Sequence, residues 1–276
     1  MRKSFWLANS VLFVTLLSTC FFYSCKNDDG KNGNDGKTDA NTPPPPKAIS
    51  YSIINSYPHD TTSFTQGLII YNGAMYEGTG NLGHSKLMKV DLKTGKSERS
   101  ISLSDEFFGE GITILRDTVY QLTWQNRVVF IYSLNDFKKI GEFKIDTEGW
   151  GITTDGKELI VSDGTSNLYF YTPSNFKFIR KVTVTEGGSL AYNLNELEYI
   201  DGFVYANQWQ APYIHKIDPV TGLVVGKVDL IDIYKKVKGK DPHADVPNGI
   251  AYDSSAKKVY VTGKLWPELY EIQLGN

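Results

Sequence analysis

Five stretches of the chain begin in a similar way, and each carries a polar or aromatic residue at the same place. These leading residues, separated by 44, 40, 45 and 53 positions, are Gln66, Glu110, Trp150, Asn195 and Asn248. Glu110 stands between Gly109 and Gly111 and follows Phe108. A carboxyl among glycines and aromatic rings is partly removed from water, which raises its pKa above the reference value of about 4.3. Such a group is suited to move a proton between reacting atoms.

The segments that follow the leading residues share one plan, in which a strand, a tight polar turn and an aromatic-rich strand come in order. The five segments cover residues 64–80, 108–124, 148–164, 194–209 and 247–266. A period of about 40–50 residues built from short strands is typical of β-propeller blades. Because every unit begins in the same way, we expect the leading residues at one height around a single axis, at the mouth of a central channel.

Each unit continues into a third strand, and the first four units continue into a fourth. The third strands are predicted at 86–91, 128–133, 167–172, 213–218 and 269–274, and the fourth near 97–103, 139–145, 178–184 and 224–230. Residues 48–58 are predicted to form one strand that completes the last blade and removes the free edges of an open array. The sequence thus predicts an all-β, five-bladed propeller over 48–276. An open β-sandwich with as many strands is the alternative.

The expected ligand site lies where the inner strands converge. Candidates at the start of first strands are Phe64, Gln66, Phe108, Glu110, Trp150 and Asn195. Candidates at the end of second strands are Glu77, Trp124, Asp163, Asn207, Trp209 and Lys264. Each has a competing structural interpretation, since amides can satisfy buried backbone groups, indoles can wedge blades apart and a lysine can be a solvated charge at the rim.

The composition of the chain argues against several classes of function. The formal net charge of −2 gives no basic surface for nucleic acid. No pair among His59, His84, His215 and His243 has the spacing of metal ligands, so no metal or cofactor is expected. The two cysteines lie within the first 25 residues, so the predicted domain has no thiol chemistry. Only 230–239 resembles an amphipathic helix.

The amino terminus has the pattern of a targeting segment. Arg2 and Lys3 precede an apolar run over 5–23, and Ser24-Cys25 is followed by a polar tract. This resembles a bacterial lipoprotein signal, and predicts a signal peptide over 1–24 and lipidation at Cys25. Residues 25–47 are then a disordered tether that ends in four prolines. We therefore expect a lipid-anchored protein of the cell envelope, periplasmic or on the outer-membrane surface.

Two alternatives remain for this segment. Cys20 is the second candidate for lipidation, although the Thr19 before it fits the signal less well. The apolar run is also long enough for an uncleaved membrane anchor.

Several motifs resemble the plant-type glutaminyl-peptide cyclotransferases. They are FTQGL at 64–68, FGEGIT at 108–113, QLTW at 121–124, EGWGIT at 148–153, NELEYIDG at 195–202, NQW at 207–209 and PNGIA at 247–251. The resemblance spans residues 50–274. It implies a five-bladed propeller that converts the N-terminal Gln of peptides or proteins into pyroglutamate and releases ammonia without a metal. The family positions match Phe64, Gln66, Phe108, Glu110, Trp124, Trp150, Asn195, Trp209 and Lys264.

On this resemblance, Glu110 is expected to carry the proton and the other eight residues to bind substrate. Separately, we expect a monomer that meets the membrane only through its lipid. Two other functions remain open. Glu110, Asp163, Asn195 and Asn248 could hold Ca²⁺ in a lactonase or esterase. Alternatively, the propeller mouth could bind peptides or glycans without turnover.

Overall fold

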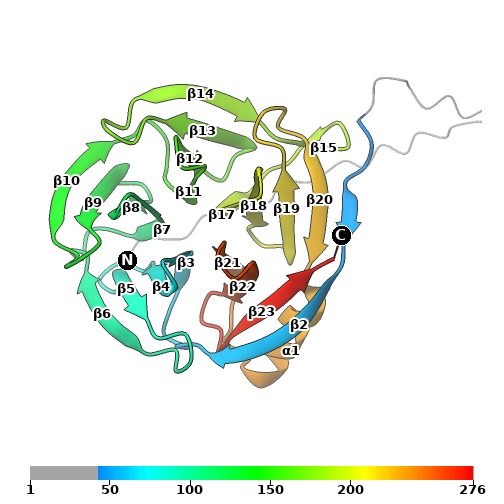
Figure 1. Cartoon of the computed structure of the whole chain (residues 1–276), viewed down its shortest axis with the longest axis horizontal. Helices are drawn as coiled ribbons and strands as arrows, with labels where there is room; N and C mark the ends of the chain where they lie inside the picture. The colour runs from blue at the N-terminus through cyan, green and yellow to red at the C-terminus, as the bar shows by residue number, and fades with distance from the viewer. Residues whose placement is uncertain (1–42, 276) are drawn as a thin grey trace, which may run out of the picture. The chain divides into compact units, whose positions relative to one another are not determined.

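The computed structural model describes residues 43–275, and these residues form a five-bladed β-propeller (Figure 1). Each blade is a sheet of consecutive antiparallel strands whose first strand lies nearest the axis. Blade 1 contains β3 (Thr65–Tyr71), β4 (Ala74–Thr79), β5 (Lys86–Val90) and β6 (Ser97–Ser102). Blade 2 contains β7 (Gly109–Leu115), β8 (Thr118–Thr123), β9 (Val128–Ser133) and β10 (Lys139–Lys144).

The remaining blades follow the same order. Blade 3 contains β11 (Ile152–Thr154), β12 (Leu159–Ser162), β13 (Asn167–Tyr171) and β14 (Phe178–Thr183). Blade 4 contains β17 (Leu194–Ile200), β18 (Phe203–Gln208), β19 (Tyr213–Ile217) and β20 (Val224–Asp229). Blade 5 contains β21 (Pro247–Asp253), β22 (Lys258–Gly263) and β23 (Glu268–Leu274). The predicted propeller is confirmed, and the sandwich alternative is wrong.

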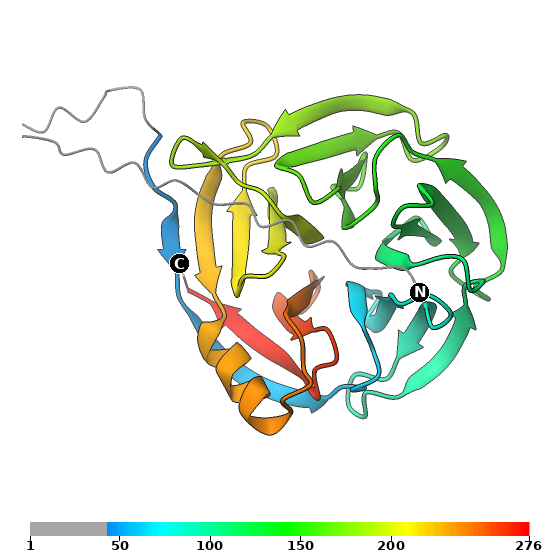
Figure 2. The ribbon, with the colours of Figure 1, turned by 180° about the vertical axis from the view of Figure 1, so that it is seen from behind.

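The ring is closed by the N-terminal part of the described chain. β2 (Tyr51–Pro58) pairs antiparallel with β23 and supplies the fourth strand of blade 5, as predicted. Figure 2 shows this blue strand beside the red C-terminal strand. The prediction of one strand over 48–58 is wrong, because the segment breaks at Ser50. The preceding β1 (Lys47–Ile49) instead adds to blade 4 in parallel with β20. The N-terminal segment thus pairs with two neighbouring blades.

Glycines let the inner strands approach one another around the axis. A Cβ atom on Gly67 would lie 2.3 Å from the backbone nitrogen of Ile112. On Gly151 it would lie 2.0 Å from the carbonyl oxygen of Asn195. These distances are too short for any side chain, so the narrow ring requires glycine immediately after the leading residue. Blade 4 differs, because Glu196 occupies that position.

Apolar side chains fill the space between adjacent blades. Leu122, Ile152 and Leu159 belong to one such cluster between blades 2 and 3. The helix α1 (Ile231–Lys240), predicted at 230–239, packs Ile233 and Val237 into the cluster shared by blades 4 and 5. Within residues 43–275, no helix has the length and apolar character needed to cross a bilayer.

The last residues of the predicted tether contact the propeller. Pro43, Pro44 and Pro45 line a cavity of about 120 Å³ together with Thr185, Gly187 and residues 223–225. Thr185 belongs to β15 (Thr185–Glu186), which pairs with β16 (Ser189–Leu190). The signal peptide predicted over 1–24, Cys20, Cys25 and most of the tether lie outside the described residues.

Candidate active site

A pocket of about 270 Å³ opens where the first strands of the blades begin and the second strands end. Its lining consists of the nine residues that the family resemblance selected: Phe64, Gln66, Phe108, Glu110, Trp124, Trp150, Asn195, Trp209 and Lys264. Trp124, Trp209 and Lys264 each come one residue after β8, β18 and β22. In antiparallel pairs the end of the second strand lies beside the start of the first, so residues distant in sequence meet at one edge.

Aromatic rings build most of the pocket wall. The ring of Phe108 meets Phe64 edge-on at 6.1 Å and Trp124 at 5.8 Å between centroids. Across the pocket, Trp150 and Trp209 pack edge-on at 5.5 Å. Edge-to-face contacts of this kind hold rings in fixed orientations. The pocket therefore has a rigid apolar wall shaped for a small group.

Two glycines leave room for these rings. A Cβ atom on Gly80 would lie 2.3 Å from the ring of Phe108. Gly164 has φ +78°, and a Cβ there would lie 2.6 Å from the indole of Trp150. Glycine is thus needed at positions 80 and 164, because a side chain there would collide with the rings of Phe108 and Trp150.

A carboxyl and an amine are buried together in this apolar setting. Glu110 and Lys264 are each only 4% exposed. Burial raises the pKa of Glu110 well above its usual value, although the Lys264 ammonium opposes the shift and Glu148 adds to it. Burial likewise lowers the pKa of Lys264, against the attraction of Glu110 and Asp245. Both groups are pushed toward their neutral forms, which favours proton exchange near neutral pH.

The polar amides of the pocket differ in their hydrogen bonding. The Nδ2 of Asn248 donates to the Oε1 of Gln66 at 3.1 Å, which leaves the Gln66 amide nitrogen to donate to a ligand. The Oδ1 of Asn195 is buried and accepts no hydrogen bond from residues 43–275. A buried acceptor without a donor is costly, so a ligand N–H at this atom would be favourable. The pocket thus offers both a donor and an acceptor.

Sequence reasoning missed Glu148, which supports two of the aromatic walls. Its Oε2 accepts the indole N–H of Trp124 at 2.7 Å and that of Trp150 at 3.1 Å. The signal was present in the motif EGWGIT, where Glu148 precedes Trp150 by two residues. Because Trp124 belongs to blade 2 and Trp150 leads blade 3, one carboxylate fixes two walls from different blades.

Four other candidates do not line the pocket. Asn248, predicted beside the other leading residues, instead supports Gln66 and the carbonyl of Thr65. Asn207 accepts the N–H of Gly249, and the Oδ1 of Asp163 accepts from Thr165 within a turn. Glu77 is buried against His59. These polar residues satisfy donors within the fold.

The four residues considered as calcium ligands therefore do not meet at one site. Glu110 and Asn195 line the pocket, whereas Asp163 and Asn248 do not. Among the described residues, no three His, Cys, Asp or Glu side chains gather in a metal-binding arrangement.

The fold and the site together define a propeller enzyme with an aromatic pocket and a buried carboxyl–amine pair. The sequence model of the family described as Glutamine cyclotransferase matches residues 31–274. A glutaminyl-peptide cyclotransferase of Arabidopsis thaliana is 42% identical over 225 residues, which cover 80% of this chain and 70% of the relative. The crystal structure of Myxococcus xanthus glutaminyl cyclase matches with a TM-score of 0.79 at 34% identity and covers 83% of this chain and 98% of that chain. The chain belongs to the glutamine cyclotransferase family.

Proposed function

We propose that the chain acts as a glutaminyl-peptide cyclotransferase, which converts the N-terminal Gln of a peptide or protein into pyroglutamate with release of ammonia. The observation that carries the mechanism is the burial of Glu110 in the aromatic pocket, beside a buried lysine. The pocket volume of about 270 Å³ suits a single folded side chain with its α-amine. The remainder of the substrate would extend from the mouth.

The first task of the pocket is to hold the reactive shape of the substrate. The α-amine nitrogen attacks the side-chain amide carbon of the same residue, so a five-membered ring closes and the bond to the departing nitrogen breaks. Because both reacting groups belong to one molecule, fixing their geometry removes much of the entropic barrier. The rings of Phe64, Phe108 and the three tryptophans confine the side chain and exclude water that would hydrolyse the amide.

The second task is proton transfer. The attacking amine must lose a proton, and the departing nitrogen must gain one to leave as ammonia. Glu110 exchanges protons with both nitrogens, so that its own protonation state is restored after each turnover. Its raised pKa brings the carboxyl closer to the pKa of an α-amine, which eases transfer in both directions.

The third task is to stabilise the charge that develops on the carbonyl oxygen. The free amide nitrogen of Gln66 and the ammonium of Lys264 are donors suited to this oxygen. The unpartnered Oδ1 of Asn195 is suited to accept an N–H from the substrate nitrogen. The side-chain carbonyl oxygen and one nitrogen of the substrate then each have a protein partner.

Ammonia release from a Gln-initiated dipeptide amide tests this function. We expect turnover with a mass loss of one ammonia, and no product from the same peptide with an acetylated α-amine, which has no nucleophile. We expect EDTA to leave the rate unchanged. Loss of activity on chelation would favour the calcium-dependent hydrolase, and tight peptide binding without turnover would favour a binding propeller.

We further propose that the protein is a monomer anchored in the cell envelope through a lipid on Cys25. The support is the apolar run that ends at Ser24-Cys25 and the polar tract after it. Expression in a Gram-negative host followed by membrane fractionation tests the anchor. We expect Cys25→Ser to release the protein from membranes and Cys20→Ser to leave it attached, and the reverse result would assign the lipid to Cys20.

A further inference from the structure

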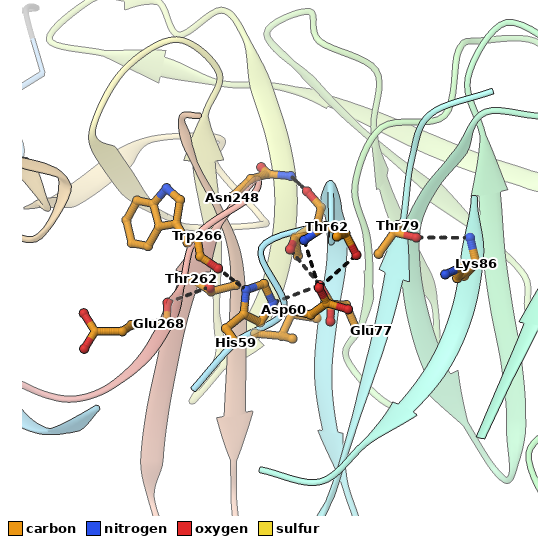
Figure 3. A network of polar contacts seen from close by, with 12 residues as sticks. His59, Asp60, Thr62, Glu77, Thr79, Lys86, Asn248, Thr262, Trp266 and Glu268 are labelled. Carbon is orange, nitrogen blue, oxygen red and sulfur yellow. Dashed lines mark hydrogen bonds and ion pairs between the residues drawn. The ribbon is translucent and has the colours of Figure 1, made fainter. Parts of the chain in front are cut away.

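A buried ion pair lies at the seam where blade 5 meets blade 1, outside the pocket lining. His59 follows the ring-closing β2, and its Nε2 lies 3.1 Å from the Oε1 of Glu77 on β4 (Figure 3). The Nδ1 of His59 lies 2.8 Å from the carbonyl oxygen of Trp266, in the turn between β22 and β23. The side chains of His59 and Glu77 are 3% and 2% exposed. The reaction described above does not use this pair.

The contacts require two protons at the pair. A carbonyl oxygen can only accept, so the Nδ1 of His59 must carry a hydrogen. The Nε2 faces a carboxyl oxygen that also accepts the hydroxyl of Thr65 at 2.7 Å. A second proton must therefore lie between the Nε2 and Glu77, so the pair is either imidazolium and carboxylate or their neutral counterparts. Loss of that proton would leave one buried, uncompensated negative charge.

The His59–Glu77 pair bonds to two residues, Trp266 and Thr65, that lie close in sequence to residues of the pocket. Trp266, which accepts from His59, follows Lys264 by two positions. Thr65, which donates to Glu77, lies between Phe64 and Gln66. Between these contacts, the N–H of Leu265 donates to the carbonyl oxygen of Ser63 at 2.8 Å. The Nζ of Lys264 lies 4.6 Å from the ring centroid of Phe64, so the two segments also meet inside the pocket.

The turn that carries Lys264 has a backbone conformation that needs external support. Leu265 has φ +60°, in the left-handed region that a leucine rarely adopts. Such a conformation costs about 1–3 kcal/mol and persists where surrounding contacts determine it. Here the surrounding contacts include the bond to Ser63 on one side and the His59 bond to Trp266 on the other. The turn is also held by backbone bonds of Lys264 to Asp245 and Val246. Loss of the His59 contact removes one of these constraints on the side that faces blade 1, and so loosens the placement of Lys264.

We propose that His59 and Glu77 are positioning residues for the cyclisation reaction, which fix Lys264 on blade 5 relative to Phe64 and Gln66 on blade 1. This inference rests on the proposed function of the pocket. It also explains why the ring is closed immediately before His59, since β2 delivers this histidine to the seam.

His59 should lose its proton at a higher pH than an ordinary histidine does. Burial alone lowers the pKa of His59, but Glu77 of β4, the hydrogen bond to Trp266 and Asp60 of the same loop together raise it above its usual value. A histidine whose folded pKa is raised adds stability below its unfolded pKa of about 6.5, and this stability is lost as the pH rises through the folded pKa. The seam should therefore loosen as the pH rises through the raised pKa of His59.

Steady-state kinetics of two histidine variants test the positioning role. We expect His59→Leu to lower kcat about 10- to 100-fold with little change in KM, because misplaced donors weaken the transition state more than substrate binding. The control is His215→Leu on β19, which removes another buried histidine that does not line the pocket. Wild-type kcat in folded His59→Leu, or an equal loss in both variants, would overturn the proposal.

The variant Glu77→Gln keeps a hydrogen-bond partner for His59 but removes the negative charge beside it. Its amide can donate to a neutral His59 Nε2, so we expect kcat within about threefold of wild type near neutral pH. The alkaline decline of kcat and of Tm should be smaller in Glu77→Gln than in wild type. An unchanged alkaline decline would overturn the proposal even if His59→Leu does not fold.

Nitrogen-15 NMR of the wild-type histidine rings gives a readout that needs no activity. We expect one histidine to keep both ring nitrogens protonated at a pH above the ordinary histidine pKa of about 6.5, and Glu77→Gln to abolish this signal. Since burial lowers the pKa of His215 to about 4, that ring should be neutral there and cannot supply the signal. Neutral rings throughout would overturn the charged form of the pair and the pH dependence expected from it. If the wild-type protein cyclises no peptide, the proposed function fails, whereas the NMR result still decides whether the charged pair exists.

Discussion

At the scale of single residues, the site depends on the burial of two groups of opposite charge, Glu110 and Lys264, away from water. Glu110 and Lys264 attract each other, yet burial moves the pKa of each toward the neutral form. A carboxyl that exchanges a proton easily at neutral pH follows from this arrangement. The aromatic wall contributes to the electrostatics as well as to the shape, because it keeps water away from both groups.

Replacing Glu110 tests its role as the proton carrier. We expect Glu110→Gln to lower kcat about 10²- to 10⁴-fold, since the amide cannot exchange the proton. The Tm should not fall, because a buried ionisable group is replaced by a neutral one of the same shape. Ammonia release and thermal unfolding measure the two effects, with exposed Glu106→Gln as the control. An active Glu110→Gln enzyme would show that another group moves the proton.

Variants of Glu148 separate its support of the indoles from its charge. Glu148→Gln keeps an oxygen for Trp124 and Trp150 but removes the charge that raises the pKa of Glu110. The pKa of Glu110 should then fall, so the acid limb of kcat/KM should move to lower pH. Glu148→Ala should also raise KM severalfold by freeing both indoles. A pH–rate profile over about pH 5–9 distinguishes the variants, and identical profiles for wild type and Glu148→Gln would contradict the charge effect.

At the scale of elements, the inner strand of blade 4 differs from the other four. Glu196 stands where blades 1, 2, 3 and 5 have glycine, and its carboxyl accepts the N–H groups of Leu68 and Ile250 at 3.2 and 2.8 Å. Two residues later, Glu198 accepts the N–H of Tyr252 at 2.8 Å. One strand therefore satisfies backbone donors on blades 1 and 5 and holds them in register around the axis.

The buried carboxyl of Glu198 predicts a pH-dependent stability. Burial raises its pKa to about 8, against hydrogen bonds from Tyr252, Tyr199 and Thr153. A raised carboxyl pKa gives stability that is present below about pH 4.3 and lost as the pH rises toward 8. Glu198→Gln should therefore gain Tm relative to wild type at pH 8 more than at pH 5, by about 2–4 °C for each kcal/mol.

Thermal unfolding at the two pH values measures this difference. Glu142→Gln, on the exposed edge strand β10, is the control and should show none. An equal shift of Glu198→Gln at both pH values would indicate that Glu198 keeps an ordinary pKa in the folded protein.

At the scale of the whole molecule, both the stability of the propeller and the geometry of the pocket depend on the closure of the ring by β2. β2 covers the edge of β23, and the residue that follows it, His59, reaches the seam beside the pocket. A break in the ring would expose a strand edge and would also remove the contact of His59 to the turn that carries Lys264. Closure of the ring therefore also brings His59 to the turn beside the pocket.

Truncation tests this coupling. A chain beginning at Pro43 should keep the Tm and the activity of the full chain. A chain beginning at His59 lacks β1 and β2, and should aggregate or lose cooperative unfolding because the β23 edge is unpaired. Light scattering and thermal unfolding compare the two. A soluble, active protein beginning at His59 would show that blade 5 is stable with three strands.

The sequence by itself determined the number of blades and nearly all strand positions, and its resemblance to a known family selected the residues that line the pocket. The blades and strands follow from local signals, because the alternation of strand residues, the turns and the repeated leading position act within about 50 residues. Once the units form a ring, equivalent positions must meet around the axis. Gln66, Glu110, Trp150 and Asn195 could therefore be placed together before any contact was known.

Only the tertiary structure decided which polar residues serve the pocket and which serve the fold. Glu77 resembled a site residue by position but pairs with His59, and Asn248 supports Gln66 from behind. The split of 48–58 into β1 and β2 was also invisible, since both parts have strand-like sequence. The physical reason is sequence separation: His59 meets Trp266 across 207 residues, and such a contact exists only after the ring has closed.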